Sequence, residues 1–400
     1  MSFRSPLRGP WLTAALGSVL LVLVTVVAVT GFLSHMAYEP DLRGNAIVPV
    51  DADLPLTFGW PTSPTWLYAV NQSLHVNVGL VAVPFLLAKL WSVIPRLFVF
   101  PPVRSPAHAI ERVSIALLVS STIFQFATGI VNAQYWYAFH FNFVVAHYYG
   151  AIVFVGSLAL HVIVKTPVIL KAYRDRGYLR PLRDDLAHTR PEPDGDLVPA
   201  EPDAPTISRR GLFAFVGGAS ALLLLGNVGE SIGGPVRKLA FFAPRRESFP
   251  VNKTAARAKV TADMVGPSYR LQLSGARQVS LSRDDLLALP QHTARLPIAC
   301  VEGWTTTQTW TGVRLSELAR MAGLPGADSA FVRSLQPAGV LSKASLSGDT
   351  LADPDALLAL QVNGADLPID HGYPARIIVP ALPGVHNTKW VAAIEFGAAA

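Results

Sequence analysis

The sequence predicts a multi-domain chain: an all-α bundle of four transmembrane helices, a fifth anchoring helix, and then a β-rich α+β domain. Composition is the first indication, because 51% of the 400 residues are hydrophobic and only 15% are charged, against roughly a quarter in soluble proteins. Nearly all of the excess of apolar residues lies before position 230. The C-terminal residues 261–400 instead alternate short strand-like runs with turns, interrupted by one amphipathic helix at about 314–323.

Five apolar stretches are long enough to cross a bilayer, which takes about 20 helical residues. Four of them make up the predicted domain 1–175, at approximately 11–33, 74–98, 109–131 and 143–165. The fifth stretch, 211–229, lies in the predicted anchoring helix 208–232, which opens with Ser208, Arg209 and Arg210. Paired arginines before a moderately apolar helix resemble a twin-arginine export signal. Two ordinary arginines on the inner side of the membrane are the alternative reading.

Basic residues alternate between successive loops as membrane topology requires. Arg4 and Arg8 precede the first span, whereas the loop 35–66 is acidic and has a single arginine. The next loop and the segment after the fourth span are again rich in lysine and arginine. The positive-inside rule therefore predicts a protein of the cytoplasmic (inner) membrane with its N-terminus inside and everything after residue 230 outside. This topology explains the net charge of +6 better than a nucleic-acid partner does.

Two segments are predicted to connect the folded parts. Residues 176–207 are rich in proline and acidic residues, which predicts a disordered cytoplasmic linker. Residues 233–260 are predicted to be a short tether to the last domain. The one cysteine of the chain, Cys300, excludes an intramolecular disulfide and multi-cysteine metal sites. It leaves a buried apolar cysteine, a reactive thiol or a single thiolate ligand.

Histidines inside apolar spans are functional candidates, because an unpaired polar side chain is costly there. His147 and His161 are fourteen residues apart in the fourth span, which places them on one helix face about 21 Å apart. His75 lies at the outer end of the second span, in the same leaflet as His147, and His35 is a spare candidate in the first. Imidazole is the usual axial ligand of haem b, so we expect His75 and His147 to bind one haem iron. His161 is the candidate ligand of a second haem, and a hydrogen-bonded bundle histidine is the alternative for each. The pattern resembles the four-helix cytochrome b of formate dehydrogenase gamma subunits.

The most specific motifs lie in two runs of the last domain. The first is RLPIACVEGWTTTQTWTGVRLSEL, with a cysteine at the end of a predicted strand before Glu-Gly-Trp. The second contains D-H-G-Y-P-x-R and, further on, Lys-Trp. Together they resemble the molybdopterin-binding domain of the sulfite oxidase family, which includes the periplasmic methionine sulfoxide reductases. The resemblance covers most of 265–397 and implies molybdenum held by one pyranopterin dithiolene.

The resemblance implies roles for the matching residues. Cys300 would be the thiolate ligand of molybdenum, and a soft sulfur donor suits such a site. Tyr373 and Arg376 would complete the catalytic set, and the planar guanidinium of Arg376 suits a phosphate or an anionic substrate. The cofactor would also contact Glu302, Gly303, Trp304, His371, Lys389 and Trp390. The sequence departs from the family at His386, where a basic residue would be expected.

Joined together, these parts predict a membrane-bound, molybdenum-dependent oxidoreductase. It would exchange electrons between the quinone pool, a membrane haem b and an extracytoplasmic oxo-molybdenum centre that acts on a small substrate. A reductase of sulfoxide-type substrates is the preferred prediction, and a sulfite-type dehydrogenase that passes electrons inward is the alternative. A cofactor-free docking or structural domain on a membrane cytochrome is the rival from another class. The sequence leaves the substrate, the direction of electron flow, the haem count and the oligomeric state open.

Overall fold

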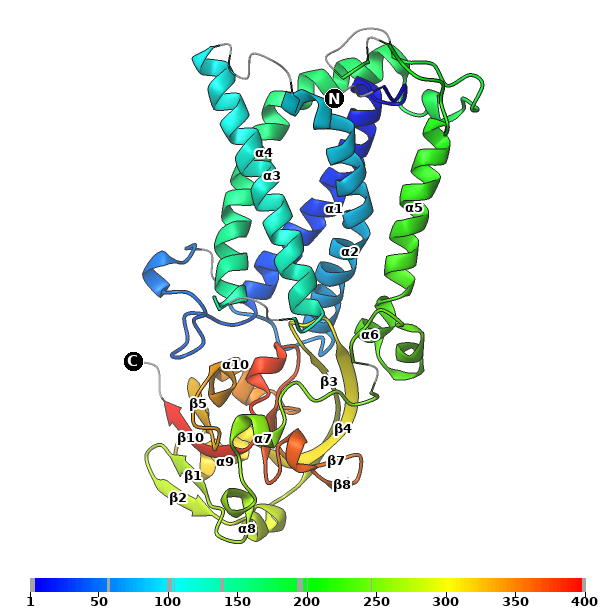
Figure 1. The fold of residues 1–400 in the computed structure, drawn as a ribbon. Coiled ribbons are helices and arrows are strands. Elements are labelled where there is room, and N and C mark those ends of the chain that lie inside the picture. Colours follow the sequence, from blue (N-terminus) through cyan, green and yellow to red (C-terminus); the bar gives the residue numbers. More distant parts are fainter. Residues whose placement is uncertain are drawn as a thin grey trace. The chain divides into compact units, whose positions relative to one another are not determined.

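The computed structural model describes most of the chain, in the ranges 4–55, 58–98, 103, 105–136, 140–192, 197–199, 201–245 and 247–397 (Figure 1). Parts of the predicted loop, linker and last domain therefore lie outside the described residues, at 56–57, 193–196, 200 and 398–400. Contacts divide the chain into two compact units. We call Met1–Val29 with Leu74–Asn227 the helical unit, and Thr30–Ser73 with Val228–Ala400 the β-rich unit.

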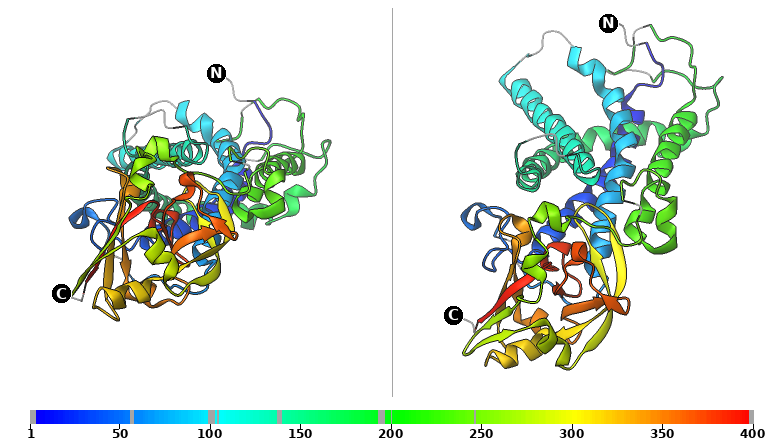
Figure 2. Two further views of the ribbon diagram at one scale, coloured as in Figure 1. Left: turned by 90° about the horizontal axis from the view of Figure 1, so that it is seen from below. Right: turned by 60° about the horizontal axis from the view of Figure 1, so that its bottom comes forward.

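Five helical segments of the described chain are long and apolar enough to cross a membrane: Pro10–Met36, Leu67–Arg96, His108–Ala133, Phe143–Arg176 and Arg209–Ile232. They contain α1 (Pro10–Met36), α2 (Leu67–Val93), α3 (Pro106–Ala133), α4 (Phe143–Arg176), α5 (Arg209–Leu225) and α6 (Val228–Ile232). In Figures 1 and 2, α3 and α4 run side by side. The predicted membrane-length helices are confirmed, and their arrangement as a bundle of four plus one anchor stays a prediction.

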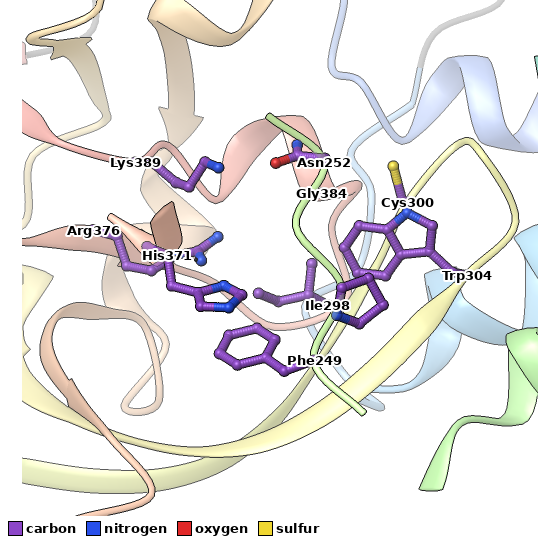
Figure 3. A pocket seen from close by; sticks show the side chains of 10 residues that line it. Phe249, Asn252, Ile298, Cys300, Trp304, His371, Arg376, Gly384 and Lys389 are labelled. Atoms are coloured by element: carbon purple, nitrogen blue, oxygen red, sulfur yellow. Dashed lines mark hydrogen bonds between the residues drawn. The ribbon is translucent and has the colours of Figure 1, made fainter. Parts of the chain in front are cut away.

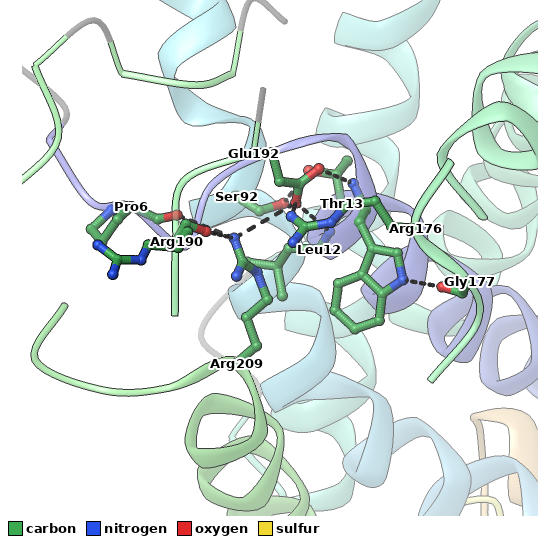
Figure 4. A network of polar contacts seen from close by, with 10 residues as sticks. Pro6, Leu12, Thr13, Ser92, Arg176, Gly177, Arg190, Glu192 and Arg209 are labelled. Carbon is green, nitrogen blue, oxygen red and sulfur yellow. Dashed lines mark hydrogen bonds and ion pairs between the residues drawn. The ribbon is translucent and has the colours of Figure 1, made fainter. Parts of the chain in front are cut away.

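One buried carboxylate corrects the prediction for the linker 176–207. Glu192 is buried and accepts hydrogen bonds from the backbone N–H groups of Trp11 (2.8 Å) and Leu12 (3.4 Å), at the start of α1 (Figure 4). These N–H groups have no partner within the helix, and a negative charge complements the helix dipole at this end. The prediction of disorder is therefore wrong at Glu192, because its carboxylate caps α1.

The first of the paired arginines is also buried. Arg209 is 0% exposed and donates hydrogen bonds to the carbonyl oxygens of Pro6 (3.3 Å) and Arg190 (2.9 Å). Its guanidinium lies 3.9 Å from the carboxylate of Glu192 (Figure 4). Ser208 caps α5 by accepting a hydrogen bond from the backbone N–H of Gly211. These contacts give Ser208 and Arg209 a role in packing α5, and the export signal stays a prediction.

The β-rich unit contains two sheets of five strands each within its described residues. The first has the order β2 (Gln278–Leu281), β1 (Leu271–Ser274), β10 (Val391–Gly397), β5 (Ser329–Ser334) and β6 (Lys343–Ser347). The second has the order β3 (His292–Ala299), β4 (Thr305–Arg314), β7 (Leu357–Val362) and β8 (Ala365–Asp366), with β9 (Arg376–Ile378) paired to β7. The prediction of a β-rich C-terminal domain is confirmed.

The core of this unit follows from the alternation of side chains along its strands. Leu271 and Leu273 of β1 are at most 1% exposed, while the residues between and after them face outward. The helix α9 (Leu315–Met321) begins directly after β4 and buries Leu315 and Leu318 in the same cluster. The predicted helix at 314–323 is therefore confirmed, with a start one residue later and an end two residues earlier.

The loop between α1 and α2 belongs to the β-rich unit. Asn45 pairs with Ser345 of β6 twice, since its amide donates to the Ser345 carbonyl (3.0 Å) and its oxygen accepts from the Ser345 N–H (2.8 Å). The indole N–H of Trp60 donates to the carbonyl of Ala381 (2.7 Å), whose own N–H donates to Thr65 (3.2 Å). These bonds satisfy backbone groups of an edge strand and of a loop, so residues far apart in sequence fold as one unit.

Candidate functional site

A pocket in the β-rich unit collects residues from three stretches of the chain (Figure 3). Antiparallel pairing of β3 with β4 brings Ala299 opposite Thr305, which places the connecting loop at the pocket's edge. β9 and the segment before β10 supply the opposite side, and the predicted tether 233–260 runs along it. The lining residues are Phe249, Pro250, Asn252, Ile298, Cys300, Trp304, His371, Arg376, Gly384 and Lys389.

Cys300 begins a tight turn between β3 and β4. Its N–H donates to the carbonyl of Trp304 (2.9 Å), and its carbonyl accepts from the N–H of Gly303 (3.0 Å). Gly303 has a φ of +102°, a backbone conformation that favours glycine. Glu302 accepts hydrogen bonds from the indole of Trp304 (3.0 Å) and from the Cys300 sulfur (3.4 Å). The turn therefore fixes Cys300 and Trp304 beside each other.

The Cys300 side chain is 8% exposed and is protonated in the absence of a metal. Burial, together with the charge of Glu302, raises the pKa of the Cys300 thiol well above its usual range. Such a thiol is a poor free nucleophile, because the thiolate is the reactive form. A bound metal ion reverses this, since coordination deprotonates a thiol outright. The position of Cys300 thus favours a metal ligand over a reactive cysteine.

Two buried cations face the same pocket. Arg376 and Lys389 are 5% and 7% exposed (Figure 3). Arg376 donates to the carbonyls of His371 (2.9 Å) and Asn387 (3.1 Å), and Lys389 donates to the carbonyls of Asp370 (2.9 Å) and Lys253. Neither cation forms an ion pair within the described residues. Buried charges without a counter-ion are costly, so this pocket favours an anionic ligand.

The pKa values of the pocket's basic groups follow from the same burial. Desolvation lowers the pKa of Arg376 to about 9 and, with the nearby Arg376 charge, lowers the pKa of Lys389 to about 7. Burial, followed by the charges of Arg376 and Lys389, lowers the pKa of His371 to about 4. The neutral ring of His371 stacks on Phe249, with centroids 3.6 Å apart and planes 11° apart. The pocket therefore offers two cations and an aromatic wall.

Three buried polar atoms near these cations lack a hydrogen-bond partner in the described part of the chain. They are Nε of Arg376, Nδ2 of Asn387 and Oγ1 of Thr388. Of these three residues, Arg376 lines the pocket, and an orphaned buried polar atom there indicates a ligand. Together with a buried thiol and two buried cations, it fits the metal and the phosphate of a molybdenum–pyranopterin cofactor.

The structure brings five of the predicted site residues to the pocket: Cys300, Trp304, His371, Arg376 and Lys389. Glu302 and Gly303 form hydrogen bonds with Cys300 in the cysteine turn, and neither lines the pocket within the described residues. Tyr373 also lies away from the lining, where its ring packs under the guanidinium of Arg283 at 4.9 Å. Trp390 is 1% exposed and donates to the carbonyl of Ile369 (2.7 Å), so its contacts are those of a core residue.

Other lining residues were not predicted, namely Phe249, Pro250, Asn252, Ile298 and Gly384. The first three come from the tether, which is held in place when Thr306 donates to the carbonyl of Ser248 (2.8 Å). Nothing in the composition of the tether distinguishes it from an ordinary connection. Gly384 follows a proline, and this pair is a weak sequence indication of a turn. A Cβ atom there would lie 3.0 Å from the carbonyl oxygen of Ala299.

His386 stands where the family would be expected to carry a basic residue. Its ring is 1% exposed and lies within 3.3 Å of the Asn45 amide nitrogen, edge-on to Tyr38. Burial lowers the pKa of His386 to about 4, so the ring is neutral at pH 7. His386 therefore contacts the loop between α1 and α2, and the pocket's two cations are Arg376 and Lys389.

In the helical unit, His75 of α2 and His147 of α4 face each other with ring centroids 6.3 Å apart and planes 80° apart. Metal–imidazole bonds of about 2 Å on both sides of one iron would put the centroids about 6 Å apart. Nδ1 of His75 lies 2.9 Å from the Val27 carbonyl, and Nδ1 of His147 lies 2.9 Å from the Thr128 hydroxyl. Ligating histidines are usually oriented by such bonds on the second nitrogen. The pair fits a haem iron.

The other two histidines considered for haem have different surroundings. No second histidine ring contacts His161 within the described residues, so the structure offers no pair there. Nε2 of His35 lies 2.9 Å from the carboxylate of Asp53, in a buried pair of the β-rich unit. This carboxylate accounts for the burial of His35 without a haem.

Comparison with known proteins matches residues 258–400 to the family described as "Oxidoreductase molybdopterin binding domain". Mitochondrial sulfite oxidase of Mus musculus is 33% identical over 157 residues, which cover 32% of this chain and 29% of that protein. NADH nitrate reductase of Volvox carteri is 30% identical over 158 residues, covering 32% of this chain and 18% of that protein. The uncharacterized oxidoreductase YuiH of Bacillus subtilis (strain 168) is 32% identical over 152 residues, covering 37% of this chain and 74% of that protein. The chain thus spans less than a third of the sulfite oxidase and about three quarters of YuiH.

Proposed function

Because the chain belongs to the family of oxidoreductases with a molybdopterin-binding domain and is a molybdopterin-dependent oxidoreductase, we propose that it works in the cytoplasmic membrane. It exchanges electrons between the quinone pool, one haem b and a molybdenum centre on the outer side. One observation carries this proposal: a single chain combines a buried thiol beside two buried cations with a facing pair of histidines in membrane-length helices. The alternation of basic residues between loops supports the outward placement of the β-rich unit.

The residues of the pocket have distinct roles in this proposal. Cys300 would hold molybdenum as a thiolate, which requires the loss of its proton. Arg376 and Lys389 would bind the phosphate of the pyranopterin. Phe249 excludes water from the side that faces His371. When bound, the cofactor supplies two-electron oxygen-atom transfer, and the protein orients it and tunes its electronics.

The histidine pair supplies the connection to the membrane in this proposal. His75 and His147 would hold the haem iron, with their Nδ1 atoms oriented by Val27 and Thr128. A haem bound there would supply one-electron transfer between a quinol and the molybdenum centre. The proposal includes one haem, because His161 has no histidine opposite it in the described chain.

The charge of the pocket favours an uncharged sulfoxide-type substrate that is reduced. The cofactor's phosphate takes both cations of the pocket, and His371 is neutral because its pKa is about 4. The rest of the lining carries no charge and includes Phe249, Pro250, Ile298 and Trp304 alongside Asn252. Such walls suit a small neutral molecule better than a dianion. The sulfite oxidases among the relatives favour the second candidate, a sulfite-type dehydrogenase that passes electrons inward.

The two candidates differ in the expected direction of electron flow. Detergent-purified protein, loaded with its cofactor, is mixed with a reduced short-chain quinol and methionine sulfoxide or dimethyl sulfoxide. We expect quinol oxidation at least about tenfold faster than sulfite-driven reduction of the same quinone, because discrimination by pocket polarity reaches this size. Faster sulfite-driven reduction would establish the dehydrogenase instead. Cys300→Ser protein serves as the blank in both assays.

The pKa of Lys389 predicts how cofactor binding depends on pH. In the cofactor-free protein the lysine pKa is about 7, against about 10.4 in an unfolded chain. A phosphate needs the charged lysine, so the apparent affinity for the cofactor falls by up to about tenfold per pH unit above 7. The free energy of unfolding of the cofactor-free protein changes with pH in the opposite direction. Between pH 7 and about 10 the unfolded chain binds more protons, so this lysine makes stability rise with pH.

The measurement is the molybdenum retained per chain after equal incubations at pH 6, 7 and 8. Lys389→Arg is the matched control, because a guanidinium stays largely charged over this range even where burial lowers its pKa to about 9, as it does for Arg376. We expect retention to fall with pH in the parent and to be flatter in the arginine variant. Equal pH profiles in both proteins would show that Lys389 does not bind the phosphate.

A further inference from the structure

Three side chains donate hydrogen bonds to alternate carbonyl groups after Cys300, two in the loop and one at the first residue of β4. Gln72 of α2 donates to the carbonyl of Val301 (2.9 Å), and Ser231 of α6 donates to that of Gly303 (2.8 Å). Arg237 of the short helix η4 (Gly234–Leu239) donates to the carbonyl of Thr305. All of these residues belong to the β-rich unit, and none of the three donors lies in its sheets. The cysteine loop is therefore held from outside the sheets that present it.

Gln72 is the donor whose geometry is most constrained. It is 5% exposed, and its side-chain oxygen accepts from the hydroxyls of Ser34 (3.2 Å) and Tyr68 (3.5 Å). Ser34 and Tyr68 are themselves 3.0 Å apart. With its oxygen held by two hydroxyls, the amide must direct its NH₂ group to Val301. A buried network that is satisfied in this way keeps one arrangement.

The carbonyl that Gln72 contacts belongs to Val301, the residue directly after Cys300. The side chains on either side of Val301 are also in contact, since the Cys300 sulfur lies 3.4 Å from the carboxylate of Glu302. The bond from Gln72 therefore fixes the orientation of the peptide group between Val301 and Glu302, next to the residue that carries the sulfur.

We propose that Gln72 is a positioning residue for the molybdenum ligand Cys300, acting through its hydrogen bond to the Val301 carbonyl on the orientation of the cysteine loop. The inference rests on the proposed role of Cys300. Groups that orient a metal ligand also tune the metal that the ligand holds. Gln72 accordingly fixes the direction in which the cysteine loop presents the sulfur to the metal.

The test replaces Gln72 by an apolar residue of the same length, Gln72→Met. It removes the donor and leaves the Val301 carbonyl unsatisfied. We expect the Mo(V) electron paramagnetic resonance signal to change and the midpoint potential of molybdenum to shift, with about a tenfold loss of turnover. Molybdenum and haem contents per chain are measured alongside and are expected to stay at parent values.

The neighbouring residue provides a matched control. Asn71 is 7% exposed, lies in the same turn of α2, and donates to the carbonyl of Thr30 (2.9 Å). Asn71→Leu removes a buried amide of the same kind without touching the cysteine loop, so its signal and potential should equal those of the parent. If Gln72→Met folds poorly, Gln72→His restores a donor and should return the parent signal.

Two results would overturn the proposal. A parent-like signal and potential in Gln72→Met would show that the Val301 bond does not act on the metal. An equal change in Asn71→Leu would show that the effect is general to this end of α2. Cys300→Ser separates this failure from that of the proposed function: if serine leaves the Mo(V) signal unchanged, Cys300 is not the ligand and both proposals fall.

Discussion

Replacing Cys300 by serine is expected to reduce turnover by more than about a hundredfold, since even residues that only support a metal ligand cost ten- to hundredfold. A hydroxyl is a harder donor than a thiolate and suits this metal less well. The substitution is nearly isosteric, and the turn that holds position 300 depends on backbone bonds to Gly303 and Trp304. The fold should therefore persist while the metal centre changes.

Three measurements on one sample check this expectation. Turnover should fall, the Mo(V) signal should lose its parent form, and the optical spectrum of the haem should be unchanged. Glu302→Gln is the matched control, because Glu302 accepts from the sulfur at 3.4 Å without lining the pocket. Parent-like turnover in Cys300→Ser would contradict the assignment of the ligand.

The part of the site that could be predicted from sequence is the part fixed by short-range geometry. A cysteine at the end of β3 followed by Glu-Gly-Trp requires only one turn, in which Gly303 supplies the positive φ. The spacing within one helix was equally informative for His147, because a histidine facing the bundle must meet a neighbouring helix. Its ring contacts that of His75, as the shared leaflet predicts.

Contacts between distant segments could not be predicted from the sequence. The loop between α1 and α2 was predicted only as an acidic connection, yet Asn45 and Trp60 pair with backbone groups some three hundred residues later. Phe249 and Asn252 belong to what was predicted as a tether and line the pocket. Single polar or aromatic residues in loops carry no periodicity, so only the folded chain reveals their partners.

Four strands, namely β4, β6, β7 and the two-residue β8, have no counterpart among the predicted strand-like runs, and the first three have a physical reason. β4 is rich in threonine, which is β-branched and suits a strand. Because threonine is polar, the hydropathy of this segment resembles that of a loop. β6 is short and made largely of small residues, and it gains stability as an edge strand from the Asn45 pairing. β7 is a nearly continuous apolar run that periodicity alone cannot distinguish from a buried helix. Pairing with β4 and β9 decides its conformation.

Replacing His147 by alanine is expected to remove haem b from the protein while the molybdenum content stays at the parent value. The ring is one of only two histidines that face each other in the described helices, and alanine offers no ligand in its place. Quinol-driven turnover should then be lost, whereas turnover driven by a soluble reduced dye should persist. Optical spectra, metal analysis and the two assays on one preparation measure these four quantities.

His161→Ala is the control that separates loss of a ligand from loss of helix packing. His161 lies on the same helix α4, and no histidine ring contacts it in the described chain, so its variant should keep both the haem and quinol-driven turnover. Haem retained in His147→Ala would contradict the paired ligation. Loss of the dye-driven activity along with the haem would point instead to a general collapse. The haem is assigned to electron transfer between quinol and molybdenum if His147→Ala loses quinol-driven turnover but keeps dye-driven turnover. His161→Ala must keep both activities.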